Sequence, residues 1–162
     1  MQMLLRDRWF SKQAKALQDG LYVTALSILR NESDAEDAVQ NAVMKAYKNL
    51  DVLSSKDKFK PWIFRILKNE CYRIIKLRNL SLDDEIEIED PHSDIDHEQN
   101  MTVWDAVNKL DRKYREVVVL YYYQGLKIPD IAEALEISRD NVKQRLSRAR
   151  KELKNDLEGY YG

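Results

Sequence analysis

The chain has 162 residues, 34% of them charged, and a formal net charge of −1, which suits one ordinary domain or two small ones. Its single cysteine, Cys71, excludes an intrachain disulfide, and its two histidines form no cluster at zinc-site spacing. No apolar run approaches the roughly 18 residues of a membrane span, and the N-terminus lacks a signal peptide's apolar core. We therefore expect a cytoplasmic protein with no membrane insertion, no metal and no cofactor.

Apolar residues from Leu17 to Ile28 recur at helical spacing and predict a helix over about residues 4–30, with Gly20 as a candidate bend and Asn31 as a left-handed stop. A second helix should begin at Ser33, because Ser33 and Glu36 have the spacing of a capping box. Its inner face would consist of the small apolar residues Ala35, Ala38, Val39, Ala42, Val43 and Ala46.

A polar connection over residues 50–60 leads to Pro61, which can start a third helix that is amphipathic and basic. Downstream, residues 79–108 contain no lysine or arginine, while nine carboxylates lie between Asp83 and Glu98. This acidic stretch has too few large apolar residues to fold alone. It predicts a linker, and hence domains at 1–79 and 100–162 joined by residues 80–99.

The second domain should contain four helices, the first holding Val103, Val107 and Leu110. The next would run from Tyr114 to Tyr122 and end at Gly125. Three consecutive tyrosines, Tyr121, Tyr122 and Tyr123, point in three directions on a helix. We expect two in the core and one on the surface rather than a base-stacking platform. No strand pattern appears, so the predicted fold class is all-α.

Two short helices complete this domain, the first starting near Ile128-Pro129 and the second after Ser138, a good N-cap. In the second, Val142, Leu146, Ala149 and Leu153 form one apolar stripe. Residues 139–154 carry seven basic and two acidic side chains, a local excess of five positive charges. This pattern is typical of a helix-turn-helix whose second helix enters a major groove and whose cations attract phosphates.

The simpler alternative is a C-terminal amphipathic helix with a solvated charged face. Asn141 and Gln144 favour DNA, because amides can pair bidentately with adenine. The sequence does not support an enzymatic function. The carboxylates Asp34, Glu36 and Asp37 are explained by their position at a helix N-terminus, and Cys71 has no general base near it in sequence that could activate it as a nucleophile. The four glycines form no phosphate-binding loop.

Four motifs occur in order: residues 33–40, residues 61–69, the acidic stretch, and residues 130–150. In this arrangement the chain resembles the extracytoplasmic-function sigma factors of bacterial RNA polymerase over nearly its whole length. The resemblance implies sigma domain 2 and sigma domain 4, and therefore a promoter-specificity subunit that makes no phosphodiester bonds itself. It implies three partners: core RNA polymerase, promoter DNA, and an anti-sigma factor in a stress or envelope response.

The resemblance also implies roles for individual residues. It assigns binding of the polymerase clamp to Asp37, Gln40, Asn41, Met44 and Tyr47. It assigns contacts with the minus-ten element to a second set of residues, which includes a loop that captures a flipped base. These residues are Ser54, Ser55, Lys56, Lys58, Lys60, Trp62, Arg65, Lys68, Asn69 and Arg73. For Trp62, core packing is favoured over DNA contact.

The second domain would sit on the polymerase flap and read the minus-thirty-five element with Arg139, Asn141, Lys143, Gln144, Arg145, Ser147, Arg148 and Lys151. Among these, Arg145 and Lys151, like Arg150, would contact phosphates. The chain departs from the family pattern at Asn41, where glutamate is usual, at Glu136 in the turn, and at Asn141, where threonine or serine is frequent.

One competing hypothesis is a stand-alone helix-turn-helix regulator whose N-terminal half binds a ligand or dimerises, although no sustained dimer heptad is present. Another is a serine recombinase with a C-terminal DNA-binding domain. The N-terminal half disfavours it, because it shows no alternation of strands and helices.

Overall fold

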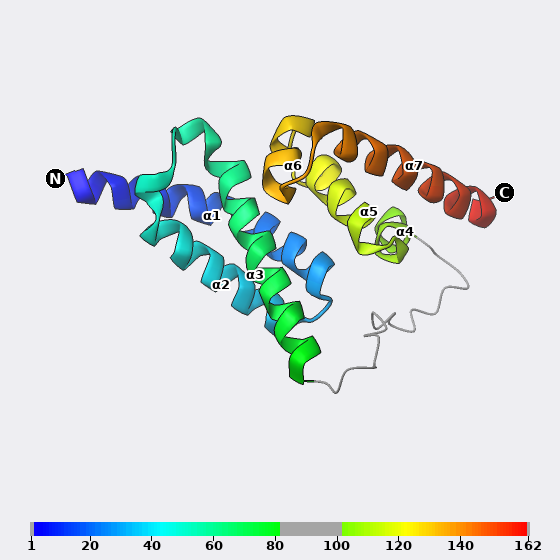
Figure 1. Ribbon diagram of the computed structural model, residues 1–162, viewed down its shortest axis with the longest axis horizontal. Coiled ribbons are helices and arrows are strands. Elements are labelled where there is room, and N and C mark those ends of the chain that lie inside the picture. The colour runs from blue at the N-terminus through cyan, green and yellow to red at the C-terminus, as the bar shows by residue number, and fades with distance from the viewer. Residues whose placement is uncertain (1, 82–101, 162) are drawn as a thin grey trace. The chain divides into compact units, whose positions relative to one another are not determined.

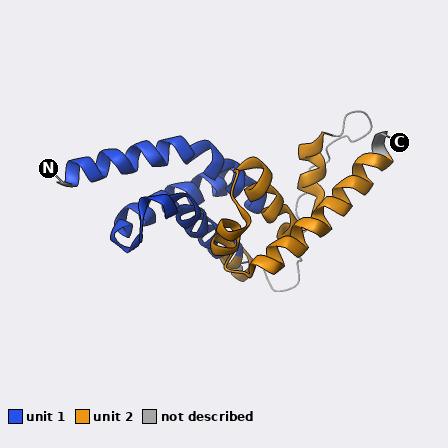
Figure 2. Cartoon of the chain, turned by 90° about the horizontal axis from the view of Figure 1, so that it is seen from above, with its two compact units in different colours: residues 1–75 blue, residues 76–162 orange. Residues whose placement is uncertain are grey.

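The computed structural model describes residues 2–81 and 102–161, and within these ranges every regular element is a helix (Figure 1). The all-α fold class expected from the sequence is confirmed. The chain divides into two compact units, Met1–Ile75 and Lys76–Gly162 (Figure 2). Apart from residues 80 and 81, the predicted acidic linker lies outside the described residues.

The first unit is built on α1 (Gln2–Leu29), α2 (Glu32–Lys48) and α3 (Phe59–Ser81). The helix α1 continues through Gly20 without a break. Two polar residues are buried in it, and each donates to a backbone carbonyl one turn earlier: Thr24 to Gly20 at 2.8 Å and Ser27 to Thr24 at 2.7 Å. Their hydroxyl groups are thus satisfied within the helix.

The turn between α1 and α2 differs from the expectation by two residues. Asn31 is the N-cap of α2, and its side-chain oxygen accepts from the Asp34 N–H at 2.9 Å. The left-handed residue is Arg30, with φ 55°. The prediction that Ser33 caps the helix is therefore wrong, because the Asn31 cap places Ser33 inside the first turn.

Between α2 and α3 the chain forms two short 3₁₀ turns, Leu50–Val52 and Lys56–Lys58. Buried Leu50 and Phe59 anchor the two ends of this connection. The helix α3 begins at Phe59, two residues before the expected start at Pro61. Proline fits there because the first N–H groups of a helix have no intrahelical acceptor.

Aromatic rings from all three helices meet in the core of the first unit. Phe59 of α3 lies edge to face with Trp9 and Phe10 of α1, with ring centroids 5.2 and 5.8 Å apart. Phe10 also meets Tyr47 of α2 at 5.3 Å. Edge-to-face pairs of this kind contribute about 0.5–1.5 kcal/mol each beyond area burial. They hold the first turn of α3 against α1.

The second unit contains α4 (Val103–Lys109), α5 (Arg112–Val118), a π-helical turn (Val119–Tyr123), α6 (Ile128–Leu135) and α7 (Arg139–Tyr161). The helix α7 contacts α4, α5 and α6 (Figure 1). It is the element around which the unit packs.

Polar contacts set the ends of the first two helices of this unit. Thr102 and Asp105 form a complete capping box at α4, with distances of 3.1 and 3.0 Å. Arg115 is 1% exposed and donates through Nη1 to the Leu110 carbonyl at 2.8 Å. Because this buried bond ties α5 to the end of α4, it positions the first turn of α5.

The three tyrosines are more exposed than expected. Tyr122 and Tyr123 are exposed and only Tyr121 is half-buried, so the expectation of two core tyrosines is wrong. The reason is the π-helical turn, in which the Gln124 N–H donates to the Val119 carbonyl five residues back, at 3.0 Å. The wider turn rotates the following side chains relative to the α-helical spacing. Gly125 then ends the element with φ 69°, as expected.

Candidate nucleic-acid interface

The turn before α7 has the geometry of a helix-turn-helix. Glu136 ends α6 in the left-handed conformation, with φ 58°, which a residue with a Cβ rarely adopts. Ser138 then caps α7, its hydroxyl accepting from the Asn141 N–H at 3.0 Å. The predicted cap is confirmed. The two helices therefore meet through a three-residue turn closed by local hydrogen bonds.

The side chains of α7 separate as the spacing predicts. Val142, Leu146 and Ala149 are at most 1% exposed, and Leu153 is half-buried. The opposite face carries exposed donors and acceptors: Arg139, Lys143, Gln144, Ser147, Arg148 and Lys151. Packing of the apolar stripe against α4, α5 and α6 thus fixes which polar side chains face outward.

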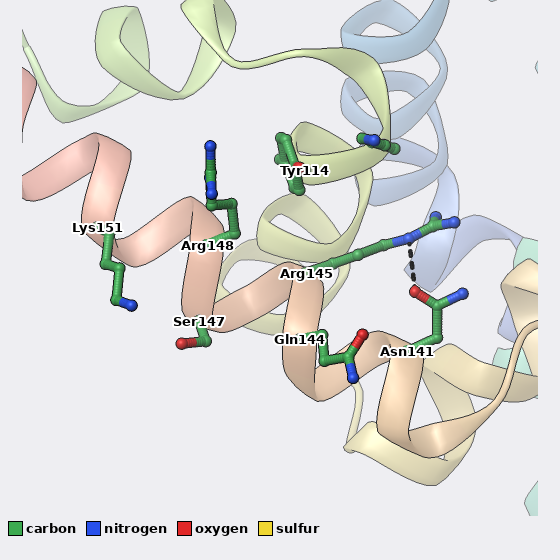
Figure 3. A pocket seen from close by; sticks show the side chains of 8 residues that line it. Tyr114, Asn141, Gln144, Arg145, Ser147, Arg148 and Lys151 are labelled. Atoms are coloured by element: carbon green, nitrogen blue, oxygen red, sulfur yellow. Dashed lines mark hydrogen bonds between the residues drawn. The ribbon is translucent and has the colours of Figure 1, made fainter.

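Asn141 and Arg145, two of the residues of α7 that we expect at the minus-thirty-five element, form a hydrogen bond with each other. Arg145 Nε donates to Asn141 Oδ1 at 3.1 Å (Figure 3). The Asn141 carboxamide keeps its N–H donors for other partners, but its oxygen is engaged by the guanidinium. Asn141 therefore orients Arg145.

Arg150 lies on a different side of α7. Its Nε donates to the Tyr122 hydroxyl at 2.8 Å, and its guanidinium lies 5.7 Å from the ring centroids of both Tyr121 and Tyr122. The sequence places Arg150 among the phosphate contacts, whereas the structure engages it with the tyrosines of the π-helical turn. The cause is again the π-helical turn, which brings these rings to α7.

A concave surface with a volume of about 490 Å³ runs along α7 and includes two residues of α5. Its lining consists of Lys113, Tyr114, Asn141, Gln144, Arg145, Ser147, Arg148 and Lys151 (Figure 3). Sequence reasoning missed Lys113 and Tyr114, because they lie about 25 residues before the start of α7 and share no periodicity with it. None of the eight lining residues is acidic.

In the first unit, the residues expected to bind the polymerase clamp share one face of α2. Asp37, Gln40, Met44 and Tyr47 are exposed, and Asn41 is half-buried. The Tyr47 hydroxyl donates to Asp7 Oδ1 at 2.7 Å, and this hydrogen bond raises the pKa of Tyr47. Met44 and Tyr47 are 55% and 42% exposed, so this face of α2 presents apolar surface to solvent.

The residues expected at the minus-ten element lie in three environments. The turn residues Ser54, Ser55, Lys56 and Lys58 are exposed, as are Asn69 and Arg73 on α3. Lys60 and Arg65 are half-buried. Trp62 and Lys68 are each 7% exposed.

Burial of Trp62 agrees with the core packing favoured for it, but the exposure expected for Lys68 is not observed. Lys68 falls on the core face of α3 beside the buried residues Leu67 and Cys71. Its ammonium lies 5.6 Å from the centroid of the Tyr72 ring. The alkyl part of the side chain therefore packs in the core, as amphipathic side chains commonly do.

A buried carboxylate that sequence reasoning also missed joins α2 to α3. The Glu70 side chain is 2% exposed, bonds Lys45 of α2, and accepts from Arg73 Nη2 at 3.0 Å. Burial raises the pKa of Glu70, but the hydrogen bonds and charges of Lys45 and Arg73 outweigh it and leave this pKa below its ordinary value. Arg73 is thus engaged within the unit.

A second concave surface, of about 430 Å³, lies beside the loop expected to capture a flipped base. Its walls come from the first turns of α1 and from the 3₁₀ connection, and include Trp9 and Lys56. The Lys56 ammonium lies 5.1 Å from the centroid of the Trp9 ring. Arg6 and Asp51 form an ion pair of 2.9 Å between the same two segments.

The described part of the chain shows no candidate metal site. Residues 2–81 and 102–161 contain no group of three or more histidine, cysteine or acidic side chains placed to hold a metal ion. Among the same residues, no helix is long and apolar enough to cross a membrane.

Comparison with known proteins identifies both units. Residues 14–80 match the model of sigma-70 region 2, and residues 100–153 match that of sigma-70 region 4. RNA polymerase sigma factor SigZ of Bacillus subtilis is 32% identical over 136 residues, covering 81% of this chain and 77% of SigZ. The ECF sigma factor SigW of the same organism is 29% identical over 159 residues, covering 86% and 84%.

Solved structures agree with these relatives. The sigma factor RpoE of Bartonella quintana, in complex with the anti-sigma factor NepR, superposes with a TM-score of 0.77 at 28% identity, covering 92% of this chain and 96% of that one. CnrH, in complex with the cytosolic domain of CnrY, superposes with a TM-score of 0.68 at 26% identity, covering 94% and 90%. Together with the order of the motifs, these matches show that the chain belongs to the extracytoplasmic-function sigma factors of the sigma-70 family.

Proposed function

We propose that this protein is a promoter-specificity subunit, which binds core RNA polymerase and directs it to promoters that carry minus-ten and minus-thirty-five elements. The observation that carries the proposal is α7, where three buried apolar residues lie opposite an exposed face of cations, an amide and a hydroxyl. Such a face has the donors needed to read base edges and to bind phosphates. Its place in a helix-turn-helix of sigma-70 region 4 supports the assignment to the minus-thirty-five element.

The N-terminal and C-terminal parts of the chain would bind different parts of the polymerase and of the promoter. Residues 1–79 would bind the polymerase clamp through the exposed face of α2 and the minus-ten element through the 3₁₀ connection and α3. Residues 100–162 would bind the polymerase flap and the minus-thirty-five element, and residues 80–99 would link the two. The match of residues 14–80 to sigma-70 region 2 supports the first assignment.

The protein would lend specificity to a catalytic partner and carry out no reaction itself. Its action would take place in the cytoplasm, where RNA polymerase and the chromosome are. Two of the similar solved structures are complexes, one of RpoE with the anti-sigma factor NepR and one of CnrH with the cytosolic domain of CnrY. By analogy, a cognate anti-sigma factor would hold this protein until an envelope or other stress releases it.

The test is to mix the purified full-length chain with sigma-free core RNA polymerase, and to measure co-elution and transcript starts on a genomic fragment library. We expect co-elution and discrete start sites that share two sequence elements. The paired substitution Met44→Ala/Tyr47→Ala on α2 should reduce co-elution, whereas Lys154→Ala, at the far end of α7, should leave it unchanged. Tight DNA binding without polymerase association would refute the proposal and favour a stand-alone regulator.

A further inference from the structure

The buried carboxylate of Glu70 holds the side chain of Arg73, a residue that we expect at the minus-ten element. Arg73 Nε and Nη2 both donate to Glu70 Oε2, at 3.2 and 3.0 Å. These bonds use two of the five N–H donors of the guanidinium. Two bonds restrict the group more than one would, because a rotation of the side chain breaks at least one of them. Glu70 therefore fixes the orientation of Arg73.

The other oxygen of the carboxylate ties Glu70 to a different helix. Glu70 Oε1 accepts from Lys45 Nζ of α2. The Glu70 side chain is 2% exposed, whereas those of Lys45 and Arg73 are about half exposed. The carboxylate thus lies beneath two cations. Any effect of Glu70 on a ligand at the surface has to pass through them.

Arg73 belongs to the side of α3 on which other expected minus-ten contacts lie. Arg65, Asn69 and Arg73 follow one another at four-residue steps, which places them on one side of the helix. Asn69 and Arg73 are exposed, and Arg65 is half-buried. The bonds to Glu70 hold the guanidinium at the end of this row.

We propose that Glu70 is a positioning residue, which holds the Arg73 guanidinium in the orientation that contacts a phosphate of the minus-ten element. This inference rests on the proposed function, because it takes α3 to lie against promoter DNA. Glu70 touches no DNA itself. It restrains, before binding, a long side chain that would otherwise lose its conformational freedom when it binds the phosphate.

Charge and orientation predict opposite effects when Glu70 is neutralised. A carboxylate close to DNA repels phosphates, so its removal would strengthen binding if charge alone mattered. The loss of orientation would weaken binding, because Arg73 keeps its charge but has to be ordered by the DNA. The sign of the change in Glu70→Gln therefore separates the two effects.

The experiment uses holoenzyme reconstituted from the full chain and core polymerase, and measures the dissociation constant for promoter DNA. It compares the parent, Glu70→Gln, Arg73→Gln and the double variant at a temperature at which tryptophan fluorescence shows all four chains to be folded. Because one ordered side chain is lost, we expect Glu70→Gln to weaken promoter binding about 2- to 10-fold. In the Arg73→Gln background the same substitution should cause no further weakening. A merely structural role would not give this result, since damage to the contact between α2 and α3 does not depend on Arg73.

Asp57→Asn is the matched control, because Asp57 is an exposed carboxylate of the 3₁₀ connection and is expected to touch neither Arg73 nor DNA. Its neutralisation should leave promoter binding unchanged or strengthen it. Unchanged or tighter binding by Glu70→Gln would overturn the inference. So would weakening that persists undiminished in the Arg73→Gln background. A loss of co-elution with core polymerase in Glu70→Gln and Arg73→Gln would also overturn it, since Arg73 would then serve the polymerase contact.

Failure of the inference differs from failure of the proposed function. If the parent holoenzyme does not discriminate promoters with intact from those with scrambled minus-ten elements, the proposed function is wrong, whatever Glu70 does. If the parent discriminates them and Arg73→Gln binds as tightly as the parent, only the positioning role of Glu70 is wrong.

Discussion

Replacing Glu70 by glutamine tests the ionic contact between α2 and α3. The carboxylate is 2% exposed, while the side chains of its partners Lys45 and Arg73 are 55% and 46% exposed. Breaking a buried ion pair costs about 3–5 kcal/mol when the remaining charge stays buried. Here both remaining cations reach water, and glutamine still offers one acceptor. We therefore expect Glu70→Gln to lower the free energy of unfolding of the first unit by a smaller amount, about 1–2 kcal/mol.

The destabilisation should depend on pH. The Glu70 pKa is lower in the folded chain than the ordinary 4.5, so the unfolded chain binds more protons around this pH and stability rises with pH. The contribution of Glu70 is complete above pH 4.5 and disappears as the pH falls below it through the folded pKa. The stability difference between the parent and Glu70→Gln should therefore shrink in acid.

The assay is denaturant unfolding followed by tryptophan fluorescence in a Trp104→Phe background, which confines the signal to Trp9 and Trp62 of the first unit. Asp19→Asn, at an exposed mid-helix carboxylate of α1, is the control and should stay within about 0.5 kcal/mol of the parent. A Glu70→Gln difference that is absent at neutral pH, or that persists undiminished in acid, would refute this reasoning.

Three further predictions concern the second unit. Leu146→Ala removes a side chain that is 1% exposed, and it should destabilise this unit by about 2–5 kcal/mol in thermal unfolding while leaving the tryptophan transition of the first unit in place. Gln144→Ala should relax base preference at one position of the minus-thirty-five element by about 1–3 kcal/mol, whereas Lys151→Ala should weaken binding to all sequences alike. If both variants lose equal affinity for specific and for random DNA, the assignment of Gln144 to a base and of Lys151 to a phosphate is wrong. Tyr122→Phe removes the acceptor that engages Arg150, so it should strengthen non-specific DNA binding slightly, and an unchanged affinity would show that this arginine does not reach DNA.

The helical periodicities were sufficient to predict the fold class and the outward face of α7. The stripe of Val142, Leu146 and Ala149 is buried as expected, because a helix with one apolar face has one way to pack it. Ser138 was also recognisable, since an N-cap is a local hydrogen bond within four residues. Such features depend on neighbours in sequence, although the cap predicted at Ser33 shows that a second capping residue nearby can take the same role.

Tertiary structure decided the features that depend on distant residues. Lys68 has the composition of a DNA contact, but its position on the core face of α3 buries it. Arg150 is engaged by tyrosines about 28 residues earlier, through a π-helical turn that no α-helical periodicity predicts. The partners of Glu70 and the approach of Lys113 to α7 likewise come from packing between helices. The sequence by itself thus determined that the chain is helical and which face of α7 is apolar. Only the packed structure decided which charges the helices leave at the surface, because that choice depends on contacts between residues far apart in the chain.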